Sequence, residues 1–452
     1  GKVNFNSIKF GKGNVDFSYV IFKDGNVDFS NASNIEGNVS FKNAIFGNGI
    51  KDFQYTDFGT GSKSFVNTEF GNGDVSFINS NFNDGKVSFK VARFGEGKVD
   101  FHFAKFGKGD ITFERVEFGN GRIDFRTVEF NTGKVNFNRS VFGDGEAAFE
   151  ASQLLDGKMS FKRTQFGDGI INFELAEYEN AELLFDRAEF GNRDISFYNS
   201  NFAHLSLKSC HLNSYVDLRV AKCAYVDLSD TIVRDILDLK PHDFNVDIKI
   251  LKMPGMRLLG RVYIDWISNS IYDIISRQDD TDHRLKAEQF RILKENFNIT
   301  GQYTDEDKAY VEFKRHESKA DLHDAIKANP VSKIWQYPSY FFRWLLFDKV
   351  GLYATNPIRV LVSMTVSFLF FTILYIILPF ILPTQIVSSL GDPDKLSLIA
   401  KSFYHSAITF LTIGYGDYYP SGLIRGLSSF EGFVGLFLMS YFTVAFVRKI
   451  LR

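Results

Sequence analysis

Phenylalanine recurs along the first half of the chain at a fixed spacing. A Phe stands at every twelfth position from Phe5 to Phe197, and a second register of the same spacing, from position 10 to 202, holds Phe in fourteen of seventeen places. Small or β-branched residues such as Val99 and Ala104 lie two positions before each Phe, and polar residues separate them. Such short alternation of inward and outward side chains is typical of brief β-strands. The pattern therefore predicts a series of stacked coils around a phenylalanine core.

The length of one coil is indicated by a difference between alternate repeat units. Units that begin at Phe22 and recur every 24 residues, to Phe190, hold Phe first in eight of eight cases and Gly next in seven. The interleaved units, which begin at Phe10, hold Phe in only six of nine. If each coil contained one unit, all units would occupy equivalent positions and should not alternate. If each coil contains two units, the units of the Phe22 series and those of the Phe10 series lie on different sides of the coil and can differ. We therefore expect 24 residues and four Phe per coil, with a narrower twelve-residue coil as the alternative.

The repeat also resembles a known family. One unit reads F-G-x-G-x-V-x-F-x-x-A-x, as in residues 94–105, and beyond Phe202 plain steps of five take over. This pattern is similar to that of the pentapeptide-repeat family, apart from a two-residue insertion in each unit. The resemblance implies a right-handed quadrilateral β-helix over residues 1–240. Because its outer faces mix charges and amides, we expect a scaffolding or regulatory role, with a cytoplasmic protein as the partner to consider.

Helical periodicity replaces the phenylalanine spacing after Asp238. Residues 241–334 are expected to form a cap on the β-helix and a helical hairpin, with helices over residues 283–298 and 305–323. The histidines of this connector are not clustered with other metal ligands, so solvated side chains are the simpler interpretation. No arrangement of catalytic residues is evident, and an enzyme is not expected.

Two apolar runs near the carboxyl terminus predict membrane spans. Residues 360–382 carry no charge, and residues 427–447 are charged only at Glu431, so each exceeds the ~20 residues that a helix needs to cross a bilayer. We expect a pore domain over residues 357–452, with an outer helix over 357–383 and an inner helix over 425–450. Since no comparable run precedes Pro357, the amino-terminal domain is expected to be cytoplasmic, in a multi-pass protein of the plasma (inner) membrane.

Aromatic residues concentrate immediately before the first span. Residues 335–356 include Trp335, Phe341 and Trp344 beside basic side chains. This composition favours an interfacial slide helix at the surface of the bilayer, and a buried cytoplasmic helix is the alternative.

The loop between the spans carries a short motif. A half-length apolar segment, residues 397–411, is followed by T-I-G-Y-G-D at residues 412–417 and by the pair Tyr419-Pro420. This order closely resembles the pore helix and selectivity filter of the potassium-channel family. The resemblance implies a homotetramer in which K⁺ is coordinated by carbonyl oxygens from each chain. The coordinating residues are then Thr412, Ile413, Gly414, Tyr415 and Gly416, with the two glycines permitting a left-handed backbone.

Further roles follow from the same resemblance. Asp417 is expected at the outer mouth of the pore, and Tyr404 or His405 is expected to support the filter. Glu431 is too costly in a bilayer without a partner, so we interpret it as a brace behind the filter that bonds the pore helix. Gly435 aligns with the gating hinge of the inner helix. The sequence does not select among the candidates for a hydrophobic gate, which are Tyr441, Phe442, Val444 and Phe446.

The chain as a whole carries little net charge, with 52 basic and 54 acidic residues and a formal charge of −2. Nucleic acid is therefore not expected as a partner, and K⁺ is the only ion or cofactor that the motifs indicate. The sequence predicts a tetrameric potassium-selective channel with a cytoplasmic β-helix. The alternative is a membrane-anchored β-helix that acts as a protein-interaction scaffold, with a pore that conducts poorly or without selectivity. Ion flux distinguishes the two.

Overall fold

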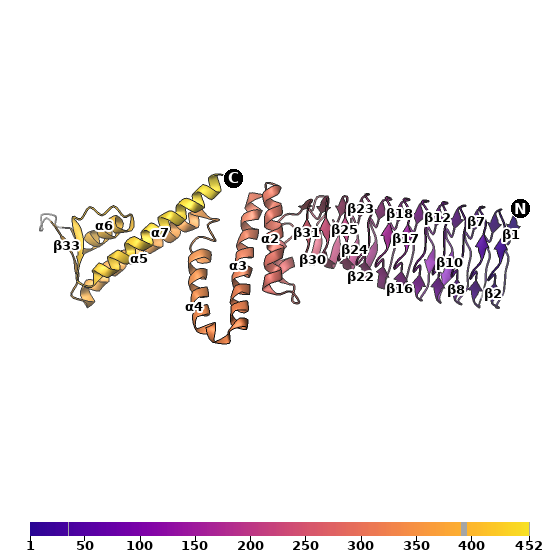
Figure 1. The fold of residues 1–452 in the computed structure, drawn as a ribbon, viewed down its shortest axis with the longest axis horizontal. Helices are drawn as coiled ribbons and strands as arrows, with labels where there is room; N and C mark the ends of the chain where they lie inside the picture. Colours follow the sequence, from indigo (N-terminus) through magenta and orange to yellow (C-terminus); the bar gives the residue numbers. More distant parts are fainter. Residues whose placement is uncertain (35, 390–395, 452) are drawn as a thin grey trace. The chain divides into compact units, whose positions relative to one another are not determined.

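The computed structural model describes residues 1–34, 36–389 and 396–451. The chain separates into two compact units, Gly1–Thr300 and Gly301–Arg452. The first unit is a parallel β-solenoid followed by helices α1 (Ile271–Ser276) and α2 (His283–Ile299), and Figure 1 shows its coils stacked one after another.

Two long parallel sheets form the main faces of the solenoid. Within the described residues, the first sheet has twelve strands: β1 (Val3–Asn4), β4 (Val27–Asp28), β7 (Lys51–Asp52), β9 (Val75–Ser76), β12 (Val99–Asp100), β15 (Ile123–Asp124), β18 (Ala147–Ala148), β21 (Ile171–Asn172), β23 (Ile195–Ser196), β26 (Val216–Asp217), β29 (Ile236–Asp238) and β32 (Arg261–Tyr263). The second has eleven: β2 (Val15–Asp16), β5 (Val39–Ser40), β8 (Lys63–Ser64), β11 (Val87–Ser88), β14 (Ile111–Thr112), β16 (Thr132–Asn136), β19 (Asp156–Ser160), β22 (Glu177–Leu184), β24 (Asn201–Ser206), β27 (Lys222–Asp227) and β30 (Asp247–Lys252). Shorter groups complete the coils: β3 (Ile21–Phe22) with β6 (Ile45–Phe46), β10 (Asn81–Asn83) with β13 (Lys105–Phe106), β17 (Val141–Phe142) with β20 (Gln165–Phe166), and β25 (His211–Leu212), β28 (Ile232–Val233) and β31 (Arg257–Leu258).

The register of the strands confirms a coil of 24 residues. Val99 pairs with Val75 on one side and with Ile123 on the other, each 24 positions away. The rings follow the same rule, since Phe89 stacks on Phe65 at 4.6 Å and 2°. Phenylalanines twelve positions apart, by contrast, meet edge to face at angles near 84°, as expected for rings that enter the core from different sides.

The coils shorten where the insertion ends. Ile195 pairs with Val216 and Val216 pairs with Leu237, so these coils span 21 residues. Paired strands continue to Tyr263. The solenoid therefore extends past residue 240, where we expected it to end, because apolar residues still occupy the inward positions after the phenylalanine spacing is lost.

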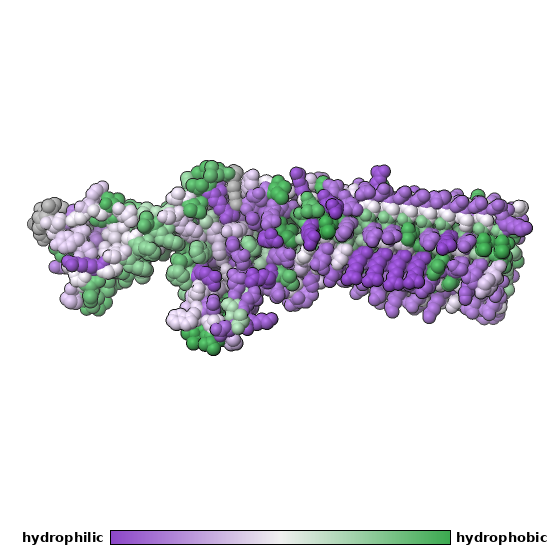
Figure 2. Space-filling view, viewed as in Figure 1, coloured by the Kyte–Doolittle hydropathy of each residue, from purple (hydrophilic) through white to green (hydrophobic). Residues whose placement is uncertain are grey.

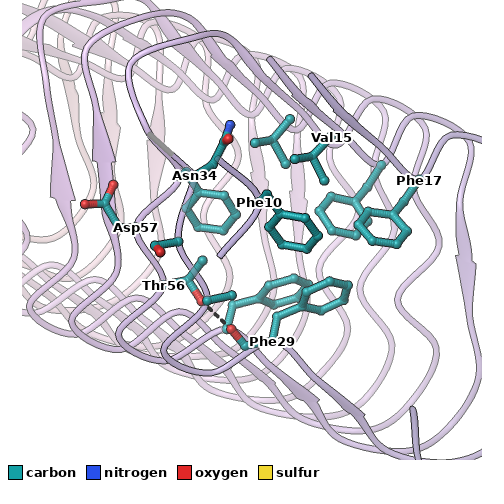
Figure 3. A pocket seen from close by; sticks show the side chains of 13 residues that line it. Phe10, Val15, Phe17, Phe29, Asn34, Thr56 and Asp57 are labelled. Atoms are coloured by element: carbon teal, nitrogen blue, oxygen red, sulfur yellow. Dashed lines mark hydrogen bonds between the residues drawn. The ribbon is translucent and has the colours of Figure 1, made fainter. Parts of the chain in front are cut away.

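Buried hydroxyl groups satisfy backbone carbonyls inside the solenoid. Figure 3 shows the interior near the first coils, where the Thr56 hydroxyl donates to the carbonyl oxygen of Phe29 at 2.9 Å. The same bond recurs from Thr68 to Phe41 and from Ser80 to Phe53, each across 27 positions. The same carbonyls also accept from backbone amides, as Phe29 does from Ala32 at 3.0 Å. The bonds therefore serve the buried hydroxyl groups, which would cost free energy in an aromatic core without an acceptor.

We expect the stacked rings to dominate the stability of the first unit. Phe101 is fully buried and stacks on Phe77 and Phe125 at 4.7 and 4.9 Å. The variant Phe101→Ala should lower the free energy of unfolding by about 3–5 kcal/mol, because it leaves a cavity in a close-packed ladder. The nearby variant Phe103→Ala, at a ring that is 45% exposed, is the control and should change it little. Chemical unfolding followed by circular dichroism measures both, and equal losses would contradict the packing argument.

Where the structure describes it, the second unit consists of helices, their connections and one short antiparallel pair of strands. Its elements are α3 (Tyr303–Ala328), a 3₁₀ turn (Pro330–Ser332), α4 (Lys333–Arg343), a π-helical turn (Trp344–Lys349), α5 (Pro357–Ile381), β33 (Gln385–Ser388), α6 (Leu398–Phe410), β34 (Tyr418–Ser421) and α7 (Ile424–Ile450). Side chains cap two of the helices, since Asn356 accepts from the amide of Arg359 and Ser397 from that of Ala400.

Helices α5 and α7 are long and apolar enough to cross a membrane. Figure 2 shows apolar surface along both of them, which suits contact with lipid more than with water. They lie where the sequence predicted the outer and inner helices, and α6 lies where it predicted the pore helix. The antiparallel pair of β33 and β34 was not predicted.

The aromatic segment before α5 differs from our expectation of one helix over residues 335–356. Helix α4 contains Pro338 and ends at Arg343, and the π-helical turn then leads into residues with positive φ at Leu352, Tyr353 and Ala354. A left-handed backbone cannot continue a right-handed helix. The segment is therefore a short helix followed by a tight connection into the outer span.

Candidate ion-conduction site

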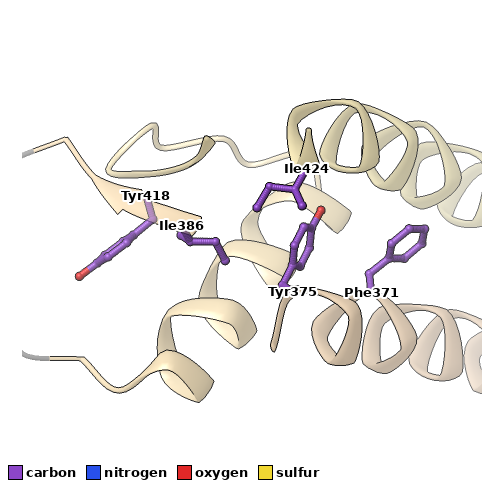
Figure 4. Packing of buried hydrophobic residues seen from close by; sticks show 5 residues of the cluster. All are labelled: Phe371, Tyr375, Ile386, Tyr418 and Ile424. Atoms are coloured by element: carbon purple, nitrogen blue, oxygen red, sulfur yellow. The ribbon is translucent and has the colours of Figure 1, made fainter. Parts of the chain in front are cut away.

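The site is the loop that follows α6. Helices α5, α6 and α7 pack on one another, and the β33–β34 pair joins them at one end. Figure 4 shows the apolar cluster there, where Phe371 and Tyr375 of α5 meet Ile386, Tyr418 and Ile424. This packing fixes the two ends of the loop, residues 411–417, between elements that cannot move independently.

The backbone of the loop alternates in handedness. Thr412, Gly414 and Gly416 have φ of 58°, 61° and 76°, whereas Ile413 and Tyr415 between them do not have positive φ. Alternation of this kind lets successive carbonyl groups face the same side, which a uniform helix or strand does not allow. We predicted the left-handed conformation at the glycines, but sequence reasoning missed it at Thr412, where it costs roughly 1–2 kcal/mol.

The carboxyl end of α6 holds the start of the loop. The carbonyl oxygen of Ile408 accepts hydrogen bonds from the amides of Ile413, at 2.8 Å, and Gly414, at 3.2 Å. The amides thus point back at the helix, which leaves the loop carbonyls available for other ligands.

The Tyr415 ring is 72% exposed in the single chain, and Ile413 is also exposed. In the single chain, the Tyr415 ring is therefore not covered by the aromatic side chains of α6.

Tyr404 of α6 ties the loop to the helix at Asp417. Its hydroxyl donates to Oδ2 of Asp417 at 2.8 Å, while Oδ1 accepts from the amide of Tyr418 at 3.0 Å. The carbonyl of Asp417 in turn accepts from the amide of Ser389 at 2.8 Å. Both ends of the aspartate are thus held in place.

His405 forms a second connection. Its Nδ1 lies 3.3 Å from the carbonyl oxygen of Tyr418, and its Nε2 lies 3.1 Å from the hydroxyl of Ser428 on α7. Because a carbonyl can only accept, Nδ1 carries a proton; in the neutral ring, Nε2 then accepts from the hydroxyl of Ser428. The sequence offered Tyr404 or His405 as the support, and the structure places both against the segment that follows the loop.

Glu431 of α7 is fully buried between the three helices. One carboxylate oxygen accepts from the hydroxyl of Tyr375 on α5 at 2.7 Å, and the other accepts from the hydroxyl of Ser406 on α6. The bond to α6 is of the kind that the sequence led us to expect, but the partner on α5 was not predicted. The Glu431 side chain thus joins all three helices through hydrogen bonds.

Gly435 of α7 packs closely against the end of α6. A Cβ atom at this position would lie 2.0 Å from the carbonyl oxygen of Phe410, which no side chain tolerates. Helix α7 runs through Gly435 without a break. The structure therefore explains the glycine at this position by close packing. Its role as a gating hinge remains a prediction.

Tyr441 differs from the other gate candidates because it is held in place. Its hydroxyl accepts from the amide of Ala354 at 3.0 Å and donates to the carbonyl oxygen of Phe347 at 3.2 Å. Phe442 stacks on Phe446 at 5.7 Å, and Val444 is exposed. Tyr441 thus joins α7 to the connection that precedes α5.

Comparison with known proteins gives an independent finding. Residues 362–452 match the model of a family described as an ion channel. No curated protein matches the chain. The matched region contains most of α5 and all of α6, the loop and the described part of α7. The carboxyl-terminal region is therefore similar to an ion channel and has two helices that could span a membrane, and in this chain it follows a β-solenoid.

Proposed function

We propose that the chain is one quarter of a homotetrameric, potassium-selective channel. The observation that carries this proposal is the alternating backbone at Thr412, Gly414 and Gly416, directly after a half-length helix and between two spans. Four such loops around an axis provide stacked rings of carbonyl oxygens, which replace the hydration shell of K⁺. Thr412, Ile413, Gly414, Tyr415 and Gly416 are the proposed coordinating residues.

Tetramer formation is supported by apolar surface that one chain leaves uncovered. Ile413 and Tyr415 at the loop, and Phe433 and Leu436 on α7, are all exposed. Side chains of this kind are stable in a bilayer only against lipid or against another subunit. We assign the loop residues to contacts with neighbouring copies, because lipid cannot reach the axis of a pore.

The other residues of the site have supporting roles in this proposal. Asp417 lies at the outer mouth, where its charge attracts cations, and Tyr404 and His405 hold the segment beside it. Glu431 braces the back of the filter through Ser406 and Tyr375. Gly435 allows α7 to approach the filter and serves as the hinge of the inner helix.

We assign the protein to the plasma (inner) membrane with the solenoid in the cytoplasm. The exposed aromatic side chains of α4, such as Trp335 and Phe341, support a position at the cytoplasmic surface of the bilayer. The solenoid is proposed to be a quadrilateral β-helix of the pentapeptide-repeat kind, with a regulatory or scaffolding role.

Purified protein in liposomes tests the function. We expect K⁺ and Rb⁺ to pass far better than Na⁺, and Ba²⁺ to block, because carbonyl rings sized for K⁺ are the proposed ion sites. If the protein is instead a membrane-anchored scaffold, the liposomes will pass little or no K⁺, or will pass K⁺ without preference over Na⁺. Equal flux of Na⁺ and K⁺ would contradict selectivity.

A further inference from the structure

The carboxyl end of the inner helix lies against α3 through ion pairs. A terminal nitrogen of Arg448 is 3.2 Å from Oδ1 of Asp307 and 3.7 Å from Oε1 of Glu306. Nζ of Lys449 is 3.1 Å from Oδ2 of Asp307. The two carboxylates are buried, with side chains 11% and 3% exposed. Removing one partner of a buried ion pair strongly destabilises a protein because it leaves the other charge buried without a partner, whereas removing an exposed pair has little effect.

An aromatic contact adds to the same cluster. The guanidinium carbon of Arg448 lies 4.4 Å from the centre of the Tyr310 ring, one turn along α3 from Glu306 and Asp307. A planar cation between two carboxylates and a ring has one preferred position. These contacts with α3 therefore fix the position of the Arg448 side chain, and with it the end of α7.

A second cluster on α3 holds the beginning of the outer span. Nε and Nη2 of Arg315 donate to the two carboxylate oxygens of Asp348 at 2.8 and 2.7 Å, and Nη1 donates to Glu312 at 2.7 Å. Asp348 is buried and lies nine positions before Pro357, the first residue of α5. Arg315 follows Asp307 by eight residues, which places both on one face of the helix, about 12 Å apart.

The two held segments also contact each other. The Tyr441 hydroxyl bonds residues 347 and 354, as described above, and a Cβ atom on Gly351 would lie 2.7 Å from the Tyr441 ring. The entrance to α5, the end of α7 and one face of α3 thus form a single packed cluster. A shift of α3 cannot occur without moving α7 or breaking the ion pairs.

We propose that α3 is a clamp that positions the inner helix, with Asp307, Glu306 and Tyr310 holding Arg448 and Lys449. The inference rests on the proposed function, because the position of α7 matters only if it opens and closes a pore. Arg448 and Lys449 are positioning residues: they act on the gate through the helix that carries them and do not touch the permeant ion. The clamp gives cytoplasmic elements a direct route to the gate that leaves the filter unchanged.

A double-mutant cycle in single-channel recordings tests the clamp. We expect Asp307→Asn and Arg448→Gln each to change the open probability by about 5-fold or more, in the same direction. The double variant should differ from wild type no more than the larger single variant does, because the two residues act through one contact. The preference for K⁺ over Na⁺ and the tetrameric state should not change. Lys449→Gln, at a half-exposed side chain, should change the open probability less but in the same direction. This variant tests the clamp even if the Asp307 and Arg448 variants do not assemble.

The matched control is Arg291→Gln, which removes an exposed pair with Glu295 on α2 and should leave the open probability unchanged. Single variants that behave as wild type, or effects that multiply in the double variant, would overturn the clamp while leaving the channel function intact. Absence of K⁺ current from the wild-type protein would overturn the proposed function and the clamp with it.

Discussion

Replacing Gly414 by alanine is expected to abolish K⁺ selectivity or conduction while the protein remains tetrameric. Gly414 has φ of 61°, and among the described residues of the chain nothing lies within 4 Å of the position that a Cβ would take. The cost is therefore conformational and not steric within one chain. A left-handed alanine costs roughly 1–2 kcal/mol, and this cost recurs in each of the four subunits. Relaxation to a right-handed backbone turns the carbonyl away from its ring.

The matched control for this variant is Gly426→Ala. Gly426 also has open space around its Cβ position, but it lies in α7 with an ordinary φ, so alanine is favourable there. Ion flux in liposomes and the size of the detergent-solubilised particle measure both variants. Normal selectivity in Gly414→Ala would mean that residues 412–416 are not the filter.

Replacing Glu431 by leucine is expected to destabilise the filter more than replacing it by glutamine. Leucine removes the acceptor of the buried Tyr375 hydroxyl, at about 1–3 kcal/mol, and leaves the Ser406 hydroxyl with only its longer bond to the carbonyl oxygen of Phe368, at 3.3 Å. The amide of glutamine can still accept one of these bonds. We therefore expect Glu431→Gln to alter inactivation while largely keeping the preference for K⁺ over Na⁺, and Glu431→Leu to lose steady current.

Recordings with and without internal Mg²⁺ separate this role from a pore-facing one. Ser429→Ala is the control and should behave as wild type, because Ser429 is an exposed residue of the same helix whose hydroxyl donates to the carbonyl oxygen of Arg425, one turn earlier. A carboxylate that faces the pore would change divalent block in both Glu431 variants without changing inactivation. That outcome would contradict the brace.

The sequence predicted the elements whose signal is periodic. Phenylalanines at positions 65, 89 and 113 stack as the alternation of units required, because each coil repeats the same local pattern and errors in register would bury polar residues. The two spans and the half-length helix were predicted for a similar reason, since length and hydropathy alone decide which segments suit a bilayer.

Departures from the repeat could not be predicted in the same way. Lys51 and Lys63 stand in the inward slot between valines of neighbouring coils, Lys51 with Val27 and Val75 and Lys63 with Val39 and Val87. Both are buried, which lowers the pKa of each to about 8 because desolvation disfavours the charged form. From the sequence alone, a lysine in the repeat is expected at the surface, and only the structure shows that these two side chains point into the solenoid.

Contacts between distant segments were also beyond sequence reasoning. Lys449 and Asp307 are 142 positions apart, and each looks like ordinary helix-surface charge in its own segment. The same holds for Tyr375, whose role as a partner of Glu431 depends on how α5 packs on α7. By contrast, Tyr404 and Asp417 are only 13 positions apart, and the motif indicated both residues as parts of the site, although not the bond between them.

The measurement that tests the central claim most directly is the reversal potential of single channels in a planar bilayer, with K⁺ on one side and Na⁺ on the other. If the carbonyl rings at residues 412–416 select K⁺, the reversal potential will follow the K⁺ gradient and the current will be carried almost entirely by K⁺. A reversal potential near zero, with both ions carrying current equally, would contradict the account.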